Sequence, residues 1–156
     1  MNDIIGIKRY GIHEIRELLA SWGEPRFRAD QLIEWVYAKR APDYSSMSNL
    51  PKALRERLQR DLPLPSPTVI KKQVSSDGTH KYLLQMADGC CIETVGIPDK
   101  GRLTVCFSTQ VGCGMGCVFC ETGTRGLTRS LGPGEMVDQL MVVSADMEAR
   151  VTNAVA

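Results

Sequence analysis

Three cysteines in the chain have a spacing that suits an iron–sulfur cluster. Cys113, Cys117 and Cys120 form a C-x3-C-x2-C pattern in one short segment. Three thiolates leave one iron of a 4Fe–4S cluster without a protein ligand, whereas a cluster used for electron transfer normally has four cysteine ligands. S-adenosylmethionine can chelate such an open iron through its amino and carboxylate groups. The spacing therefore predicts a 4Fe–4S cluster that binds S-adenosylmethionine and splits its sulfonium to a 5′-deoxyadenosyl radical.

Neighbouring residues suit a loop that wraps a cluster. Glycine permits the unusual backbone angles and the close approach that such a loop needs, and four glycines stand here: Gly112, Gly114, Gly116 and Gly123. Phe119 directly precedes the last cysteine. Its ring can keep water off one side of the cluster, and solvent exposure influences the reduction potential. We therefore expect Phe119 to contribute to cofactor binding together with Cys113, Cys117 and Cys120.

Three other uses of these cysteines stay open at the level of the residues. A structural zinc site needs four ligands, and Cys106, Cys90 or Cys91 could complete it, since His13 and His80 are distant in sequence. A ferredoxin-like electron carrier would need Cys106 as a fourth cluster ligand. Disulfides are disfavoured because the chain shows no signal peptide and no regular cysteine framework, which indicates a reducing compartment and predicts a cytoplasmic protein.

The composition indicates a globular protein without a strong overall charge. At 156 residues and 43% hydrophobic content, the chain can bury one moderate core or two small ones. No apolar run is long enough to span a bilayer, and a net charge of +1 gives no global basic field for nucleic acid. Local arginines can still contact phosphates, although for the first three a solvated helix face is the alternative: Arg55, Arg57, Arg60, Arg125 and Arg129.

Residues 1–66 are expected to form a small helical domain. Apolar residues recur at helical spacing from His13 to Ala20 and again from about Arg28 to Lys39. A third helix is predicted to begin with Pro51 in its first turn, a favoured position for proline. It carries a leucine every four residues: Leu50, Leu54, Leu58 and Leu62. The alternating prolines that follow indicate an extended linker: Pro63, Pro65 and Pro67.

Residues 67–100 are expected to form a short antiparallel β segment. The predicted strands are residues 69–74, 81–86 and 91–95. They are separated by Asp77-Gly78 and Asp88-Gly89, and Asp-Gly between apolar-rich runs is a strong hairpin signal. The pattern therefore predicts a meander, which Pro98 and Gly101 close.

From residue 101 the pattern becomes that of a parallel α/β structure. Leu103 to Phe107 predicts a strand that leads into the cysteine loop, Gly134 to about Met147 predicts a helix, and Val151 to Ala156 predicts the start of a buried strand. Together they form a βαβ unit, whose ligands gather at the carboxyl ends of the strands. One such unit cannot cover both faces of a parallel sheet. We therefore expect a fragment of a longer enzyme, with a naturally short protein that pairs with another chain as the alternative.

Several segments resemble the RlmN/Cfr-type radical SAM RNA methyltransferases. The strongest likeness is the run Val105-Cys106-Phe107-Ser108-Thr109-Gln110-Val111-Gly112-Cys113, continued by Cys120-Glu121-Thr122-Gly123 and Arg129-Ser130-Leu131. Further similar segments are Phe27-Arg28-Ala29-Asp30-Gln31-Leu32, Leu50-Pro51-Lys52-Ala53-Leu54-Arg55, Ser76-Asp77-Gly78-Thr79 and Glu93-Thr94-Val95. The resemblance covers essentially the whole chain.

The resemblance implies an α/β fold with three parts. These are a helical N-terminal accessory domain at 1–66 that helps to bind RNA, a short antiparallel β segment at 67–100, and the beginning of a partial (β/α) radical SAM barrel at 101–156. It also implies methylation of carbon 2 of an adenine in 23S rRNA and in tRNA. The enzyme would be a cytoplasmic monomer without membrane association that takes electrons from a donor such as flavodoxin.

The family's chemistry explains the need for a radical. Carbon 2 of adenine lies between two ring nitrogens and is too electron-poor to attack a sulfonium methyl group. Family members use two molecules of S-adenosylmethionine: one methylates a cysteine thiolate, and the other supplies the radical that activates this methyl group. The alternatives are a Cfr-like carbon-8 methyltransferase and, from another class, a non-catalytic iron–sulfur or zinc binding module.

The resemblance also assigns roles to single residues. Cys113, Cys117 and Cys120 match the cluster ligands, and Glu93 matches the carboxylate that accepts a proton near the target base. Cys106 matches the second catalytic cysteine, which helps to resolve the protein–RNA adduct and can form a disulfide bond with the methyl-carrying cysteine. That methyl-carrying cysteine and the Gly-Glu-Pro segment that binds S-adenosylmethionine have no counterpart in these 156 residues. The chain alone is therefore expected to lack methyl transfer.

Overall fold

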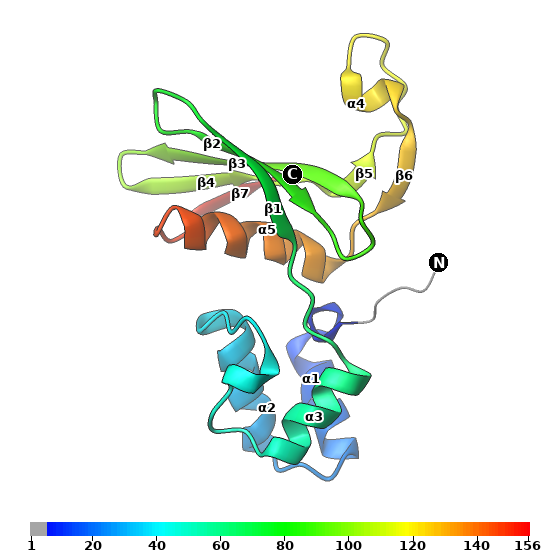
Figure 1. Cartoon of the computed structure of the whole chain (residues 1–156), viewed down its shortest axis with the longest axis vertical. Coiled ribbons are helices and arrows are strands. Elements are labelled where there is room, and N and C mark those ends of the chain that lie inside the picture. The colour runs from blue at the N-terminus through cyan, green and yellow to red at the C-terminus, as the bar shows by residue number, and fades with distance from the viewer. Residues whose placement is uncertain (1–5) are drawn as a thin grey trace. The chain divides into compact units, whose positions relative to one another are not determined.

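The structure is a computed structural model that describes residues 6–156 (Figure 1). It divides into two compact units, Met1–Pro65 and Ser66–Ala156, which are described separately. This division lies next to the end of the helical domain that the sequence predicts at residue 66. No helix in the described part of the chain is long and apolar enough to cross a membrane.

Helices make up the first unit, as the sequence predicts. Its elements are η1 Ile7–Arg9, α1 Ile12–Ser21, α2 Arg26–Ile33, η2 Glu34–Ala38, η3 Tyr44–Ser46 and α3 Lys52–Asp61. The repeated leucines line the buried side of α3 and its two flanks: Leu50, Leu54, Leu58 and Leu62. Pro51 is the residue immediately before α3, with an extended backbone that directs the chain into the helix. The four-residue repeat therefore marks a true core stripe.

The second predicted helix is divided into two parts. It begins at Arg26, slightly earlier than expected, and its end, η2, is π-helical, with the Lys39 amide donating to the Glu34 carbonyl at 2.9 Å. The chain then turns back so that Tyr44 is buried and its hydroxyl donates to the Leu62 carbonyl at 2.6 Å. This hydrogen bond ties the segment after η2 to the end of α3.

One mixed five-stranded sheet forms the second unit. Its strands lie in the order β1-β2-β3-β4-β7. Neighbours are antiparallel from β1 to β4, whereas β4 and β7 are parallel. Because α5 (Pro133–Asp146) connects the parallel pair, the predicted βαβ unit is confirmed. The strand bounds are β1 Thr68–Val74, β2 His80–Gln85, β3 Cys91–Asp99, β4 Arg102–Cys106 and β7 Asn153–Val155.

Helix α5 covers one face of this sheet (Figure 1). Its Val143 packs in one core with buried strand residues, which are Tyr82, Leu84, Ile92, Leu103 and Val105. Gly96 lets the helix approach closely, since a Cβ there would lie 2.6 Å from a methyl carbon of Val143. Residues that alternate with this core set point to the opposite face and are exposed or half-buried. The second unit therefore has one packed face and one open face.

Two strands differ from the expectation. The last strand was predicted to be buried, but Asn153–Val155 is exposed, because β7 is an edge strand whose partner in the sheet is β4. Strand β3 continues to Asp99 and includes Pro98, which was expected to close the meander. The boundary expected at residues 100 and 101 lies in the hairpin between β3 and β4, and these two strands pair in one sheet.

Candidate cofactor loop and open sheet face

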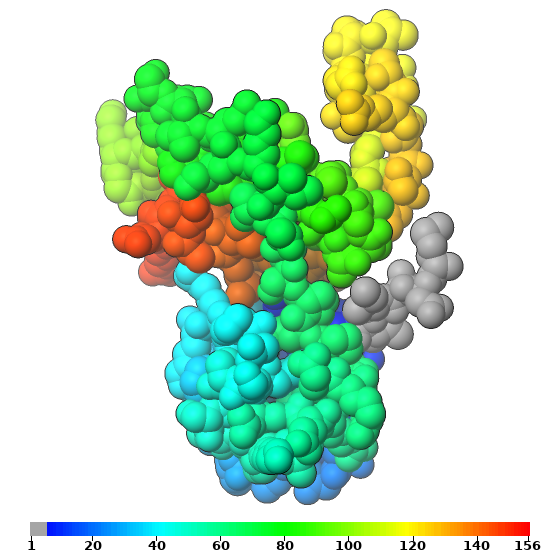
Figure 2. All heavy atoms as spheres, viewed as in Figure 1, coloured from blue at the N-terminus to red at the C-terminus, as the bar shows by residue number. Residues whose placement is uncertain are grey.

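The cysteine loop lies at the end of a two-stranded hairpin. Strands β5 (Gln110–Gly112) and β6 (Leu127–Ser130) pair antiparallel and flank the loop. One short helix, α4 (Glu121–Thr124), begins directly after the last cysteine. Figures 1 and 2 show this segment, in yellow, projecting away from the sheet of its own unit. The hairpin therefore presents the loop at a distance from the packed core.

Two glycines are required where the loop closes. Gly112 has a φ of 78°, and a Cβ at this position would collide with the carbonyl oxygen of Gly126. That carbonyl accepts a hydrogen bond from the Cys113 amide at 3.0 Å. Gly123 has its own close contact, since a Cβ there would lie 3.0 Å from the backbone nitrogen of Cys117. The backbone therefore folds tightly around the cysteines, as a loop that wraps a cofactor needs to do.

The three thiols are partly accessible and chemically free. Cys113, Cys117 and Cys120 are each half-buried, and all six cysteines of the chain are free of disulfides. Within residues 6–156, no group of three cysteine, histidine or carboxylate side chains is arranged to hold a metal ion. The donor set still suits an iron–sulfur cluster, because one glycine-rich loop supplies three thiolates. Binding would require these thiols to converge.

Apolar side chains on the same loop face solvent. Phe119 is 89% exposed and Val118 is 91% exposed, and Met115 is also exposed. Phe119 therefore packs on no core of either unit, and its part in cofactor binding stays a prediction. An apolar rim around three thiols would lower the local dielectric if a cofactor or another segment covered it.

Glu93 and Cys106 lie on the open face of the sheet. Cys106 of β4 pairs directly with Val95 of β3, and residues two apart on a strand share a face, so Glu93 and Cys106 share one face. Both are exposed, whereas Ile92 is buried against α5. Lys81 of β2 reaches Glu93, with 2.7 Å between the lysine nitrogen and a carboxylate oxygen. Sequence reasoning missed Lys81, because the contact depends on strand register.

The arginines proposed as phosphate contacts are largely paired with acceptors. In the helical unit, Arg60 pairs with Asp61 at 2.7 Å and Arg57 lies 3.6 Å from the same carboxylate. Arg55 donates to the Ser45 carbonyl at 2.6 Å. In the second unit, Arg125 pairs with Glu121 on the cysteine loop, and Arg129 pairs with Asp88 and Glu135. Arg125 is exposed, whereas Arg129 is half-buried.

Comparisons with known proteins agree on one family. Residues 5–63 match the family described as the ribosomal RNA large subunit methyltransferase N-terminal domain. A relative from Syntrophotalea carbinolica, named "Dual-specificity RNA methyltransferase RlmN", is 46% identical over 143 residues, which are 91% of this chain and 38% of that protein. A "Probable dual-specificity RNA methyltransferase RlmN" from Dictyoglomus thermophilum is 46% identical over 148 residues, which are 94% of this chain and 41% of that protein.

A solved structure gives the same answer for the fold. The crystal structure of a radical SAM methyltransferase from Sphaerobacter thermophilus matches with a TM-score of 0.87 and 42% sequence identity, over 96% of this chain and 45% of that one. The fold is thus that of the matched part of a radical SAM methyltransferase. Within that class, the sequence is similar to those of RNA methyltransferases named RlmN, and residues 5–63 match the N-terminal domain of that family. It spans about two fifths of the length of the curated relatives that it matches.

Proposed function

We propose that this chain is the N-terminal part of an enzyme that methylates carbon 2 of an adenine in 23S rRNA and in tRNA. Similarity to proteins named as RNA methyltransferases supports RNA methylation. One observation supports the site: Glu93 and Cys106 share the open face of the sheet, and the chain runs from Cys106 at the end of β4 towards the cysteine loop. The carboxyl ends of strands are where ligands gather in α/β folds.

In this proposal the cysteine loop binds the cofactors. Cys113, Cys117 and Cys120 hold a 4Fe–4S cluster, and Phe119 shields one side of it. Three thiolates leave one iron for the amino and carboxylate groups of S-adenosylmethionine. When bound, the cluster supplies the electron for reductive cleavage of S-adenosylmethionine, with a protein such as flavodoxin as the electron donor.

Residues of the open face handle the RNA adduct. Glu93 accepts a proton near the target base, and Lys81 holds its carboxylate at 2.7 Å. Cys106 helps to resolve the protein–RNA adduct. Its exposed thiol can form a disulfide bond with the methyl-carrying cysteine of the family, which has no counterpart in these 156 residues. Methyl transfer therefore needs a segment beyond those described.

The helical unit supplies RNA contacts in this proposal. Three cations lie over aromatic rings at 4.0–4.8 Å in three pairs, which are Arg28 with Phe27, Lys39 with Trp35, and Arg57 with Trp22. Aromatic rings and guanidinium planes are the groups on which unpaired RNA bases stack. This arrangement supports RNA binding by residues 1–66. We take the enzyme to be a cytoplasmic monomer.

Anaerobic reconstitution with iron and sulfide tests the cofactor site. We expect about four irons per chain and an EPR signal that changes when S-adenosylmethionine is added. Cys117→Ala should abolish iron binding, whereas the control Cys90→Ala should leave it unchanged. Stoichiometric zinc without a response to S-adenosylmethionine would instead support a non-catalytic binding module. Loss of the cluster in Cys106→Ala would make Cys106 a fourth ligand, as in an electron carrier.

Product analysis tests the target atom. In the enzyme expressed from its complete reading frame, the methyl group should appear as 2-methyladenosine in digests of 23S rRNA and tRNA. Glu93→Gln should block release of the methylated RNA, because the proton acceptor is lost, while iron content stays unchanged. A product of 8-methyladenosine would instead support the Cfr-like alternative.

A further inference from the structure

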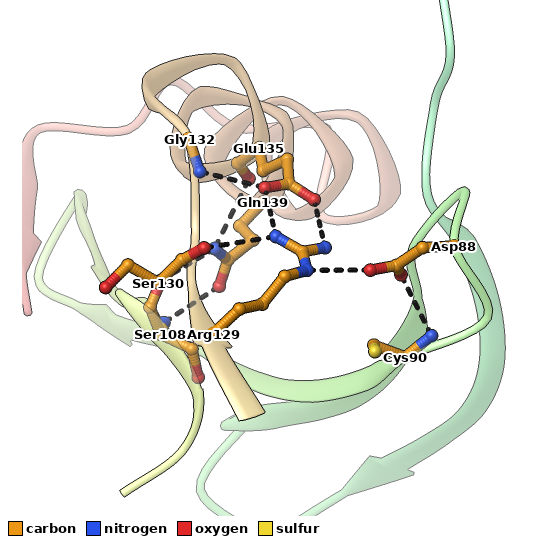
Figure 3. A network of polar contacts seen from close by, with 8 residues as sticks. All are labelled: Asp88, Cys90, Ser108, Arg129, Ser130, Gly132, Glu135 and Gln139. Atoms are coloured by element: carbon orange, nitrogen blue, oxygen red, sulfur yellow. Dashed lines mark hydrogen bonds and ion pairs between the residues drawn. The ribbon is translucent and has the colours of Figure 1, made fainter. Parts of the chain in front are cut away.

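A polar network lies at the base of the cysteine hairpin, outside the residues assigned above (Figure 3). Its centre is Arg129 in β6. The two terminal nitrogens of Arg129 donate to the two carboxylate oxygens of Glu135 at 2.8 and 2.7 Å, and its Nε donates to Asp88 at 2.7 Å. One guanidinium therefore joins β6, the first turn of α5 and the turn between β2 and β3. Bidentate arginine–carboxylate pairs are among the strongest and most directional protein contacts.

The segment that leads into β5, on the other side of the loop, is held by the same helix, α5. Gln139 of α5 is fully buried and binds both backbone groups of Ser108, just before β5. Its Nε2 donates to the Ser108 carbonyl at 2.9 Å, and its Oε1 accepts from the Ser108 amide at 2.8 Å. The hydroxyl of Thr94, in the core of β3, donates to the same Oε1. The Gln139 side chain thus forms with Ser108 the two backbone hydrogen bonds that a neighbouring strand would form.

Both contacts come from adjacent turns of one helix. Glu135 and Gln139 are four residues apart, so they lie on the same side of α5. Glu135 also accepts from the Gly132 amide at 2.8 Å, which fixes its carboxylate at the helix start. Between the two clamped strands, the Leu131 amide donates to the Thr109 carbonyl at 2.8 Å. At the base of the hairpin, the segments that carry β5 and β6 are therefore each bonded to α5 and to one another.

Electrostatics favour the ionised form of every charged member. Hydrogen bonds to Glu135 and then to Asp88 raise the pKa of Arg129, so the guanidinium stays charged. Partial burial works to raise the pKa of Glu135, but hydrogen bonds from Arg129 and Gly132 outweigh it and lower that pKa. The hydrogen bond from Arg129 likewise lowers the pKa of Asp88, against partial burial. The network is thus complete near neutral pH.

The hairpin needs such a base, because its tip has little packing of its own. Val111 and Leu131 at the base are buried. At the tip, the apolar side chains of Val118 and Phe119 are almost fully exposed. The direction in which the loop projects is therefore set at the base of the β5–β6 hairpin, which is the place where Arg129 and Gln139 act.

We propose that Arg129 and Gln139 are positioning residues that fix the cysteine hairpin to α5, so that the three thiols hold their cluster in one geometry. This inference rests on the proposed function of Cys113, Cys117 and Cys120 as cluster ligands. Neither residue is one of the three proposed ligands. A network that merely stabilises the start of α5 would change the stability of the fold, but it would leave the retention of a bound cluster unchanged.

Iron release separates these roles. After anaerobic reconstitution of the chain, Arg129→Met should release iron to a chelator about tenfold faster than the parent, as expected from the loss of charged hydrogen bonds. Arg129→Lys keeps the charge but not the bidentate geometry. It should release iron at a rate between those of the parent and of Arg129→Met. The matched control is Arg125→Met, which removes an arginine–glutamate pair of the same length, 2.7 Å, at the exposed end of the loop. This control should release iron at the parental rate.

A second measurement needs no cofactor. The Cys113 amide, bonded to the Gly126 carbonyl, should exchange its hydrogen faster in Arg129→Met and in Gln139→Glu, while amides in β2 and β3 keep their protection. Gln139→Glu retains the acceptor for Ser108 but cannot donate to its carbonyl. Parental iron release in Arg129→Met, or unchanged exchange at Cys113, would overturn the inference. Failure of the parent chain to bind iron would instead overturn the proposed function, and the exchange experiment would still report on the hairpin.

Discussion

The two units of this chain differ in how their apolar surface is covered. The helical unit buries side chains from every one of its helices in a shared core, including Ile15, Leu32 and Leu58. The second unit packs α5 on one face of its sheet and leaves the other face open. All six cysteines and Glu93 belong to the second unit, whereas both tryptophans belong to the first.

This difference separates stability from chemistry. Residues that face a closed core, such as Leu58, serve packing. Residues on the open face and the hairpin, such as Glu93, Cys106 and Cys117, are accessible to a ligand. Every chemical role proposed above falls in the second unit, whereas the role proposed for the helical unit is contact with RNA. The difference therefore predicts that a destabilising substitution in one unit can be distinguished experimentally from one in the other unit.

Leu58→Ala should have the largest effect on the helical unit. Leu58 is fully buried in its core, and such truncations cost about 2–5 kcal/mol, which is a large part of the stability of a small unit. Tryptophan fluorescence reports this unit alone, since Trp22 and Trp35 both lie in it. The fluorescence transition should therefore move to lower temperature, while the variant still binds iron after reconstitution.

Ile12→Ala is the control for this experiment. Ile12 is 50% exposed in the same unit, so its truncation should shift the fluorescence transition far less. If Leu58→Ala abolishes iron binding as well, the two units are energetically coupled and the comparison above is wrong.

Local patterns explain which parts of the molecule the sequence predicts. The leucine repeat of α3 and the Asp77-Gly78 turn act over a few residues, and both are found as expected. The hairpin of β5 and β6 was missed because its short strands are separated by the whole cysteine loop. No local pattern marks them.

The same reasoning applies to the candidate site. Spacing identifies Cys113, Cys117 and Cys120 as possible ligands, but not how far their thiols converge. Arg129 and Asp88 meet across a long stretch of chain, so the sequence suggested only a phosphate contact for this arginine. Long-range pairing of charged side chains depends on strand order and register, which composition and periodicity do not encode.

Two buried tyrosines allow a matched test of the units. Tyr44 donates to the neutral Leu62 carbonyl, and Tyr82 donates to the Asp146 carboxylate at 2.7 Å. Burial raises the pKa of both phenols, and for Tyr82 the carboxylate adds to the rise. Each Tyr→Phe change should cost about 1–2 kcal/mol near neutral pH. Hydrogen exchange of each unit should show the loss in the unit that carries the change, and a loss in the other unit would contradict their independence.

Low pH should distinguish Tyr82→Phe from Tyr44→Phe. We expect this effect to be smaller than that of Leu58→Ala and smaller than that of either tyrosine change near neutral pH. Burial opposes ionisation of Asp146, but hydrogen bonds from Lys72, Tyr82 and His80 outweigh it and lower its pKa below the ordinary value of 3.8. A carboxylate with a lowered pKa stabilises the fold above its ordinary pKa and loses this contribution as the pH falls through its folded value. The penalty of Tyr82→Phe should therefore stay constant down to the ordinary pKa of 3.8 and shrink as the pH falls below it. The penalty of Tyr44→Phe should stay constant throughout because its acceptor does not titrate. Denaturation of both variants above and below the ordinary pKa of Asp146 measures the two penalties. A constant penalty for Tyr82→Phe would show that the Tyr82 hydroxyl does not stabilise the ionised Asp146 carboxylate.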